Sequence, residues 1–151
     1  MKQLAIMSIG FIVGSVLGLA PALAAESWAG GSSQGTAARS AAVQIIHVKR
    51  GCHDWLYHGK KFVRLTLTLA PGSSLTVTDN DVMPHKLIKT SGPAVRYVGN
   101  PSMRRVSASV KVVFSHTGVY SFTTKAGEDY IKGVETIGED HQLRLVVRVV
   151  S

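Results

Sequence analysis

Residues 63–69 read Val63-Arg-Leu-Thr-Leu-Thr-Leu69, in which apolar and polar side chains alternate without a break. Such alternation is typical of a β-strand that has one face in a core and the other in water. Ala70-Pro71-Gly72-Ser73 follows as a turn signal, and residues 75–78 resume the alternation. This stretch therefore predicts a strand, a turn and a second strand.

The same period of two continues along the chain on both sides of this stretch. No segment carries a helical stripe longer than a turn or two. Many short strands separated by regular turns favour a sandwich or a barrel. We predict an all-β fold, a two-sheet Greek-key sandwich of antiparallel or mixed strands between residues 42 and 151. The further predicted strands span residues 43–48, 85–89, 106–114, 119–124 and 142–149.

The N-terminus has the three parts of an export signal. Lys2 supplies a positive charge, residues 4–19 are mostly apolar, and Ala22-Leu23-Ala24 is a small-x-small cleavage pattern. An uncleaved membrane anchor is the alternative, but the apolar run is marginal for a span and no basic cluster follows it. We expect residues 1–24 to be removed, the product to be periplasmic or secreted, and residues 25–41, rich in Gly, Ser and Ala, to form a flexible leader.

The chain is basic and has a single cysteine. Its formal net charge is +8, and removal of Lys2 with the signal would lower this to +7. Such a charge suits an acidic protein partner or an anionic membrane surface as well as it suits simple solubility. Nucleic acid is not expected outside the cytoplasm. With Cys52 as the only thiol, no intrachain disulfide can form, and the thiol is an intermolecular bridge, a liability or a ligand.

Two segments resemble the cupredoxins, the blue-copper proteins. Residues 75–85, Leu-Thr-Val-Thr-Asp-Asn-Asp-Val-Met-Pro-His, resemble the strand and Pro-His loop whose histidine is the family's first copper ligand. Residues 114–122 resemble the family's Gly-x-Tyr-x-Phe strand, and Pro71-Gly72 before a strand fits the same template. The two motifs occur in the family's order. The resemblance implies a cupredoxin-like Greek-key β-sandwich over residues 42–151, with His85 as a copper ligand.

The sequence departs from the family at the ligand loop. Thr124 stands where the resemblance implies a cysteine, and residues 125–140 contain neither Cys nor Met. The nearest histidine is His141. A blue-copper site needs two histidines, a thiolate and a weak axial ligand, so the family's usual ligand set is incomplete here.

A substitute site follows from the expected strand directions. Residues 51–61 and 79–84 should lie at the same end of the sandwich, together with Thr124 and the start of the last strand, whereas His116 should lie at the opposite end. We expect Cys52 to supply the thiolate that Thr124 lacks, with Trp55 and Tyr57 covering the 51–61 loop. Because thiolate, imidazole and thioether donors suit Cu(I), we expect a copper site. The predicted metal ligands are His85, Cys52, His53 and Met83, and the lesser candidates are His58 and His141.

Three functions remain open at this point. The first is a copper carrier or a redox protein with a rearranged site, and the second is a metal-free binding or assembly module. The third is a copper enzyme or its accessory subunit. The chain has no Gly-rich phosphate loop, no Gly-x-Ser-x-Gly elbow and no Cys-x-x-Cys pair, so we do not expect an enzyme.

Overall fold

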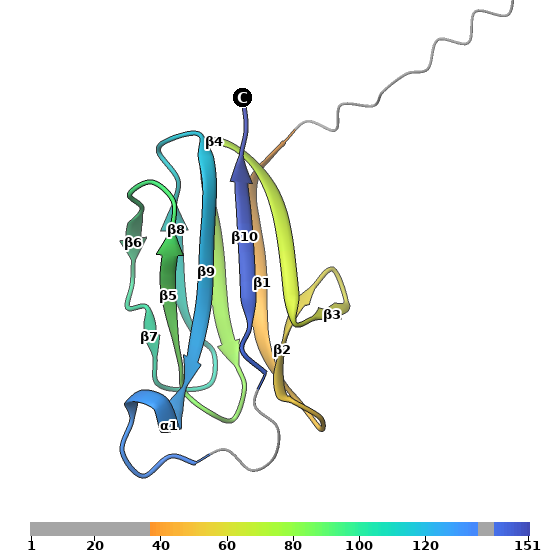
Figure 1. Cartoon of the computed structure of the whole chain (residues 1–151), viewed down its shortest axis with the longest axis vertical. Helices are drawn as coiled ribbons and strands as arrows, with labels where there is room; N and C mark the ends of the chain where they lie inside the picture. Colours follow the sequence, from red (N-terminus) through yellow and green to blue (C-terminus); the bar gives the residue numbers. More distant parts are fainter. Residues whose placement is uncertain (1–36, 136–140) are drawn as a thin grey trace, which may run out of the picture. The chain divides into compact units, whose positions relative to one another are not determined.

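The computed structural model describes residues 37–135 and 141–151. These residues form ten strands and one short helix, α1 (Gly127–Tyr130), which confirms the predicted all-β fold (Figure 1). The strands are β1 (Ala38–Val48), β2 (Cys52–Tyr57), β3 (Lys60–Phe62), β4 (Arg64–Asn80), β5 (His85–Ser91), β6 (Arg96–Val98), β7 (Ser102–Met103), β8 (Ala108–Val113), β9 (Gly118–Ala126) and β10 (Arg144–Val149).

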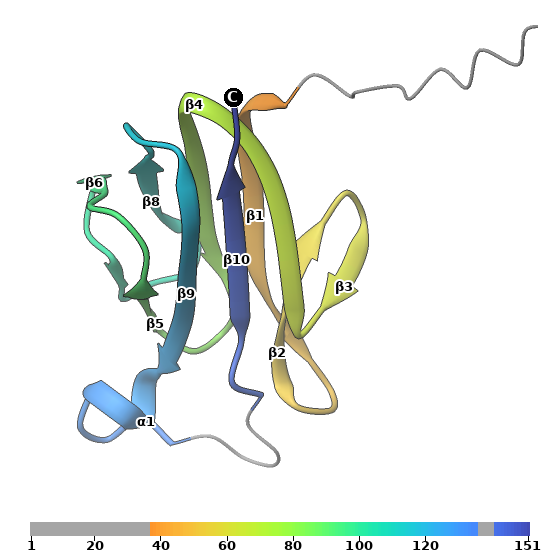
Figure 2. The same ribbon diagram turned by 45° about the horizontal axis from the view of Figure 1, so that its top comes forward.

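The long strand β4 belongs to two sheets. Residues 64–69 pair in parallel with β10, and residues 74–79 pair with β8 antiparallel and with β1 in parallel. The bend between the halves contains Gly72, whose φ of 75° lies in the left-handed region that glycine tolerates best. Figure 2 shows β4 arching from one layer into the other. The two strands predicted on either side of the Pro71-Gly72 turn are thus one continuous, bent strand.

The remaining pairings complete a sandwich of mixed strands. One sheet runs β3-β2-β1-β4-β8-β6, and the other runs β4-β10-β9-β5-β7. The chain changes sheet at each connection from β4 to β9, so strands that are adjacent in sequence are not always neighbours in a sheet. This arrangement confirms the predicted cupredoxin-like Greek-key sandwich.

The core lies between the two sheets and follows the sequence alternation. Leu65, Leu67 and Leu69 are buried, while Arg64, Thr66 and Thr68 between them are exposed. Each apolar side chain that is fully buried contributes about 1.5–3 kcal/mol relative to exposure. The largest apolar side chains of this core are Trp55, Tyr120, Phe114 and Phe122.

Two local predictions are wrong. Residues 51–61 were expected to be a polar loop, but they form the β2–β3 hairpin, and Trp55 lies completely buried in the core instead of covering a loop. The strand predicted from Val106 begins two residues later, because Ser107 has a φ of 66° and Val106 is left 57% exposed. Short hairpins and turn residues are where local patterns are least decisive.

The N-terminal predictions fall mostly outside the described residues. The signal peptide and residues 25–36 of the expected leader lie there. β1 begins at Ala38, so residues 38–41 of that segment form part of a strand. In the described part of the chain, no helix has the length and apolar character needed to cross a membrane.

Candidate metal centre

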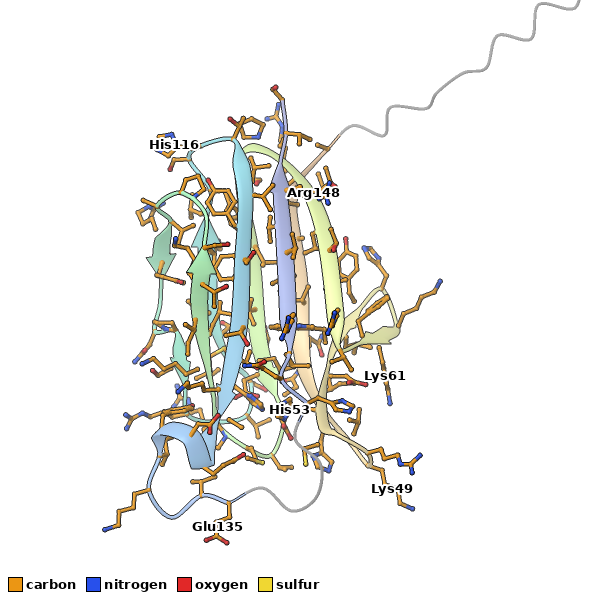
Figure 3. All side chains as sticks on the ribbon, viewed as in Figure 1. Lys49, His53, Lys61, His116, Glu135 and Arg148 are labelled. Carbon is orange, nitrogen blue, oxygen red and sulfur yellow. The ribbon has the colours of Figure 1, made fainter. Side chains whose placement is uncertain are left out.

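One end of the sandwich gathers most of the predicted site residues. The turn from β1 to β2, the segment from β4 to β5, the end of β9 and the start of β10 all lie at the lower end in Figure 1. His53 lies near this end and His116 at the opposite end, as predicted (Figure 3). The segments that were expected to share one end of the sandwich therefore do so.

Two aspartates extend the inward face of β4 toward this end. Leu75, Val77 and Asp79 occupy alternate positions, and all three are fully buried. The Asp79 carboxylate accepts hydrogen bonds from the backbone N–H of Asp81 (3.1 Å) and of His85 (2.9 Å). These bonds hold the short segment before β5 in a fixed shape and turn Asp81 inward, where it is 1% exposed.

His85 and Asp81 form a buried pair. His85 Nε2 lies 2.9 Å from Asp81 Oδ2, and the imidazole N–H donates to the carboxylate. His85 Nδ1 is also buried, and it has no hydrogen-bond partner among the described residues. A buried polar atom without a partner costs about 1–3 kcal/mol. This atom is therefore open to a further group, and a metal ion is one such group.

His53 approaches the same carboxylate from the other sheet. Its Nε2 lies 2.7 Å from the backbone carbonyl oxygen of His141, and because a carbonyl can only accept, Nε2 carries a proton. Nδ1 then faces Asp81 Oδ2 at 3.7 Å. That approach is favourable when Nδ1 is protonated or when a cation lies between the two atoms. The His53 and His85 rings meet edge to face, with centroids 4.5 Å apart.

These three side chains have the arrangement of a metal centre. Among the described residues, His53, Asp81 and His85 each offer a ligand atom, and the three atoms all lie within 4.8 Å of one another. All three side chains are buried. Ligand atoms bonded at about 2.0–2.2 Å to one ion lie at most about 4.4 Å apart, which is close to this limit. Two imidazoles and a carboxylate therefore fit a divalent transition metal such as copper or zinc.

The pKa values of the two aspartates are shifted in opposite directions. Burial raises the pKa of Asp79 to about 6, against the weaker lowering effects of His85 and the backbone N–H groups. Burial also raises the pKa of Asp81, but the hydrogen bond and charge of His85, with the Val82 N–H and His47, outweigh it and leave this pKa below its usual value. Asp81 is consequently an anion at neutral pH, as a metal ligand must be.

Cys52 lies at the same end but is not in this group, and Met83 lies in the segment between β4 and β5. Cys52 is buried, with a φ of 60°, and the His53 N–H donates to the Gly51 carbonyl across it (2.7 Å). Its burial corrects the expectation of an exposed loop position. Met83 is also largely buried. The grouped donors are His53, Asp81 and His85, and ligation by Cys52 or Met83 stays a prediction.

The two lesser candidates occupy different places. His58 is exposed in the turn between β2 and β3, at the far end of β2, and its ring meets the Tyr57 ring edge to face. The geometry does not bring it to the cluster. His141 lies beside the cluster, where its N–H donates to Gly51 O (3.0 Å) and its carbonyl orients His53.

Thr124 lines a small cavity next to His53. The cavity has a volume of about 180 Å³. The Thr124 hydroxyl oxygen is buried and has no hydrogen-bond partner among the described residues. The lining residues are His53, Thr123, Thr124, Lys125, Ala126, Asp129, His141 and Gln142.

Sequence reasoning missed Asp81, whose carboxylate contacts both histidines of the cluster. It placed residues 79–84 in a loop before His85, and it did not consider His47, whose Nδ1 lies 3.2 Å from Asp81 Oδ1. The available signal was the inward parity of Leu75, Val77 and Asp79, which predicts a buried carboxylate just before His85. A buried acid needs partners, and histidines are suitable ones.

Comparisons with known proteins give remote likenesses of fold. No protein-family model matches the chain, and no curated protein matches it. Similar solved structures include a cysteine protease inhibitor from Entamoeba histolytica (12% identity, 74% of this chain and 97% of that chain, TM-score 0.39). An oxidised mutant of amicyanin (15%, 71% and 82%, TM-score 0.36) and a mutant of rusticyanin (16%, 73% and 78%, TM-score 0.36) are also similar.

These likenesses carry no inference about copper or about protease inhibition, because the identities and TM-scores are low. The strand pairing itself defines the architecture. The chain is an all-β protein with a cupredoxin-like Greek-key sandwich fold.

Proposed function

We propose that this chain is an exported, copper-binding protein of cupredoxin-like fold, which acts as a copper carrier or as a redox protein with a rearranged site. The observation that carries the proposal is the buried cluster of His53, Asp81 and His85, whose ligand atoms lie within 4.8 Å of one another. The proposal includes no catalytic step.

Donor chemistry favours copper over other ions. Calcium and magnesium prefer shells of oxygen ligands, whereas imidazole nitrogen suits copper, zinc, iron and nickel. Among the divalent first-row metals, a given site binds Cu(II) most tightly. The grouped donors are two nitrogens and a carboxylate oxygen, so they favour Cu(II) rather than the Cu(I) expected from a thiolate and thioether set.

The same donor set favours a carrier over a blue-copper electron-transfer protein. Blue-copper sites contain a thiolate, and Thr124 supplies only a hydroxyl at the position where the family resemblance implies cysteine. Cys52 adjoins His53 in the chain, so thiolate ligation is the route by which a redox site could still form. A visible charge-transfer band would distinguish the two forms.

A metal-free binding module is the second candidate, and one observation favours it. The buried His85–Asp81 pair, with two backbone N–H groups bonded to Asp79, already holds the segment before β5 without an ion. Such a module would use the basic surface, at a net charge of +7 after signal removal, to bind an acidic protein or an anionic membrane surface.

Copper titration of the purified apo-protein separates the two candidates. We expect one equivalent of Cu(II) to bind, more tightly than Zn(II), as measured by calorimetry with a competing chelator. His53→Gln should lose most of this affinity, and His58→Gln, a matched change in the exposed β2–β3 turn, should not. Absence of stoichiometric copper binding in the folded wild type would reject the copper proposal and favour the binding module.

Export is tested separately by N-terminal sequencing of the protein recovered from the expressing cells. The Ala22-Leu23-Ala24 pattern predicts a product that begins near Ala25 in the exported fraction. A product that retains Met1 in the membrane fraction would contradict export and cleavage.

A further inference from the structure

The His53–Asp81–His85 cluster has one ligand too few to saturate a transition metal. Zinc sites that are closed have four protein ligands, and sites with three keep an open position that holds water or another small ligand. Copper with nitrogen and oxygen donors likewise takes at least four ligands in a tetragonal arrangement. Among the described residues, the cluster supplies three.

The cavity beside the cluster lies where a further ligand could enter. His53 belongs to both, since it is a member of the cluster and lines the 180 Å³ cavity. Water occupies about 30 Å³ in the liquid, so this volume accommodates a few small molecules and no large ligand. The exposed side chains at its edge, Lys125 and Asp129, carry opposite charges, so neither sign of ligand is excluded by the entrance.

Thr124 provides a polar group in this cavity that no described residue hydrogen-bonds. Thr124 is 6% exposed, and its hydroxyl has no hydrogen-bond partner among the described residues. Most buried hydroxyls in native proteins are hydrogen-bonded to protein or to ordered water. The neighbouring Thr123 shows the usual case, since its hydroxyl donates to the Leu143 carbonyl (2.9 Å). A ligand in the cavity would satisfy the Thr124 hydroxyl in the same way.

We propose that the metal centre is open, and that a small exogenous ligand binds in this cavity with the Thr124 hydroxyl as its hydrogen-bond donor. The resting ligand is water, which a small anion can displace. This inference rests on the proposed metal site at His53, Asp81 and His85, and it assigns Thr124 a role in positioning the exchangeable ligand.

Azide binding to the copper-loaded protein tests the proposal. Azide on Cu(II) gives a charge-transfer absorption band and changes the electron paramagnetic resonance spectrum, so both readouts are independent of any activity. We expect a saturable azide titration in the wild type. Thr124→Val should bind azide about 3- to 10-fold more weakly, the effect of losing one hydrogen bond. Thr124→Ser, which keeps the hydroxyl, and Thr66→Val, on the exposed face of β4, should match the wild type.

Each outcome decides one of the two linked claims. Failure to load copper, seen before azide is added, rejects the metal site itself. Copper loading without any azide response overturns the open centre and leaves the metal site standing. Equal azide affinity in wild type and Thr124→Val overturns the role of Thr124. If Thr124→Val does not fold, a size series in the wild type decides: azide should bind and the bulkier benzoate should not, and equal binding of both would place the ligand outside this cavity.

Discussion

His85 Nε2 lies 2.9 Å from Asp81 Oδ2, and both side chains are completely buried. Asp81 lies between β4 and β5, and His85 is the first residue of β5, so the pair holds the connecting segment in place and keeps the Asp81 carboxylate ionised. His53 joins the pair from the neighbouring sheet, with Nδ1 3.7 Å from the same carboxylate oxygen. Asp81 is therefore the group through which the two sheets share one polar site.

Replacing Asp81 with Asn should lower copper affinity by at least about 100-fold. The change removes the anionic donor, and even supporting residues around metal sites cost about 10- to 100-fold when they are replaced. Competition calorimetry measures the effect. Asp54→Asn is the matched control, because the Asp54 carboxylate lies 3.4 Å from His141 Nδ1 at the same end and is not in the cluster. Equal losses in both variants would contradict the special role of Asp81.

The raised pKa of Asp79 predicts a pH dependence of stability. The folded state holds the Asp79 proton to about pH 6, whereas the unfolded chain releases it near the ordinary value of 3.8. Ionised Asp79 thus costs stability above about pH 6, and the cost falls as pH is lowered toward 5. The pKa of Asp81 is shifted in the opposite direction, so Asp81 remains ionised in this window.

Asp79→Asn isolates this contribution. The free energy of unfolding of the wild type, minus that of Asp79→Asn, should increase by about 1 kcal/mol between pH 7.5 and pH 5. Urea unfolding in the presence of a chelator measures it, and groups common to both proteins largely cancel in the difference. A difference that stays constant or decreases over this range would show that Asp79 is ionised throughout.

Gly51→Ala should disturb the cluster through His141. Gly51 has a φ of 80°, and an added Cβ would collide with the His141 ring. Since the His141 carbonyl accepts the hydrogen bond that orients His53, we expect copper affinity to fall about 10-fold. Gly59→Ala is the control: its φ of 73° is similar, but a Cβ there meets open space. Gly59→Ala should cost about 1 kcal/mol of stability and leave copper affinity unchanged.

Trp55→Ala should destabilise the fold by about 3–5 kcal/mol, because the side chain is completely buried in the core and its removal leaves a large cavity. Urea unfolding measures the loss. Tyr57→Ala, two residues along the same face of β2 but only partly buried, should cost clearly less. A small effect at Trp55 would instead fit the role of a surface cover that the sequence suggested.

Local patterns predicted most of the strands and none of the aspartate contacts. The alternation in residues 63–69 predicted a strand because it reports directly which face of a strand is buried. Asp79 and Asp81 were placed in a loop, since acidic side chains are almost never fully buried unless they are paired. Their partners His53 and His85 were predicted as metal ligands. The contacts of these histidines with Asp81 could not be predicted, because they join segments from different sheets.

The placement of Cys52 and His53 likewise could not be predicted from the local sequence. Their sequence, between Gly51 and Asp54, is as compatible with a polar loop as with the first residues of a buried strand. Pairing of β2 with β1, and the approach of His141 against Gly51, decide the matter. Both contacts join segments that local propensity cannot connect.

The sequence by itself determined the all-β class, the strand periodicity and the end of the molecule at which most of the candidate ligands lie. Those features follow from the alternation of apolar side chains and from the direction in which successive strands run. Only the tertiary structure decided that the Asp81 carboxylate lies in one group with the imidazoles of His53 and His85. The reason is that β4 bends from one sheet into the other, and that bend brings the Asp81 carboxylate between two histidines from different sheets.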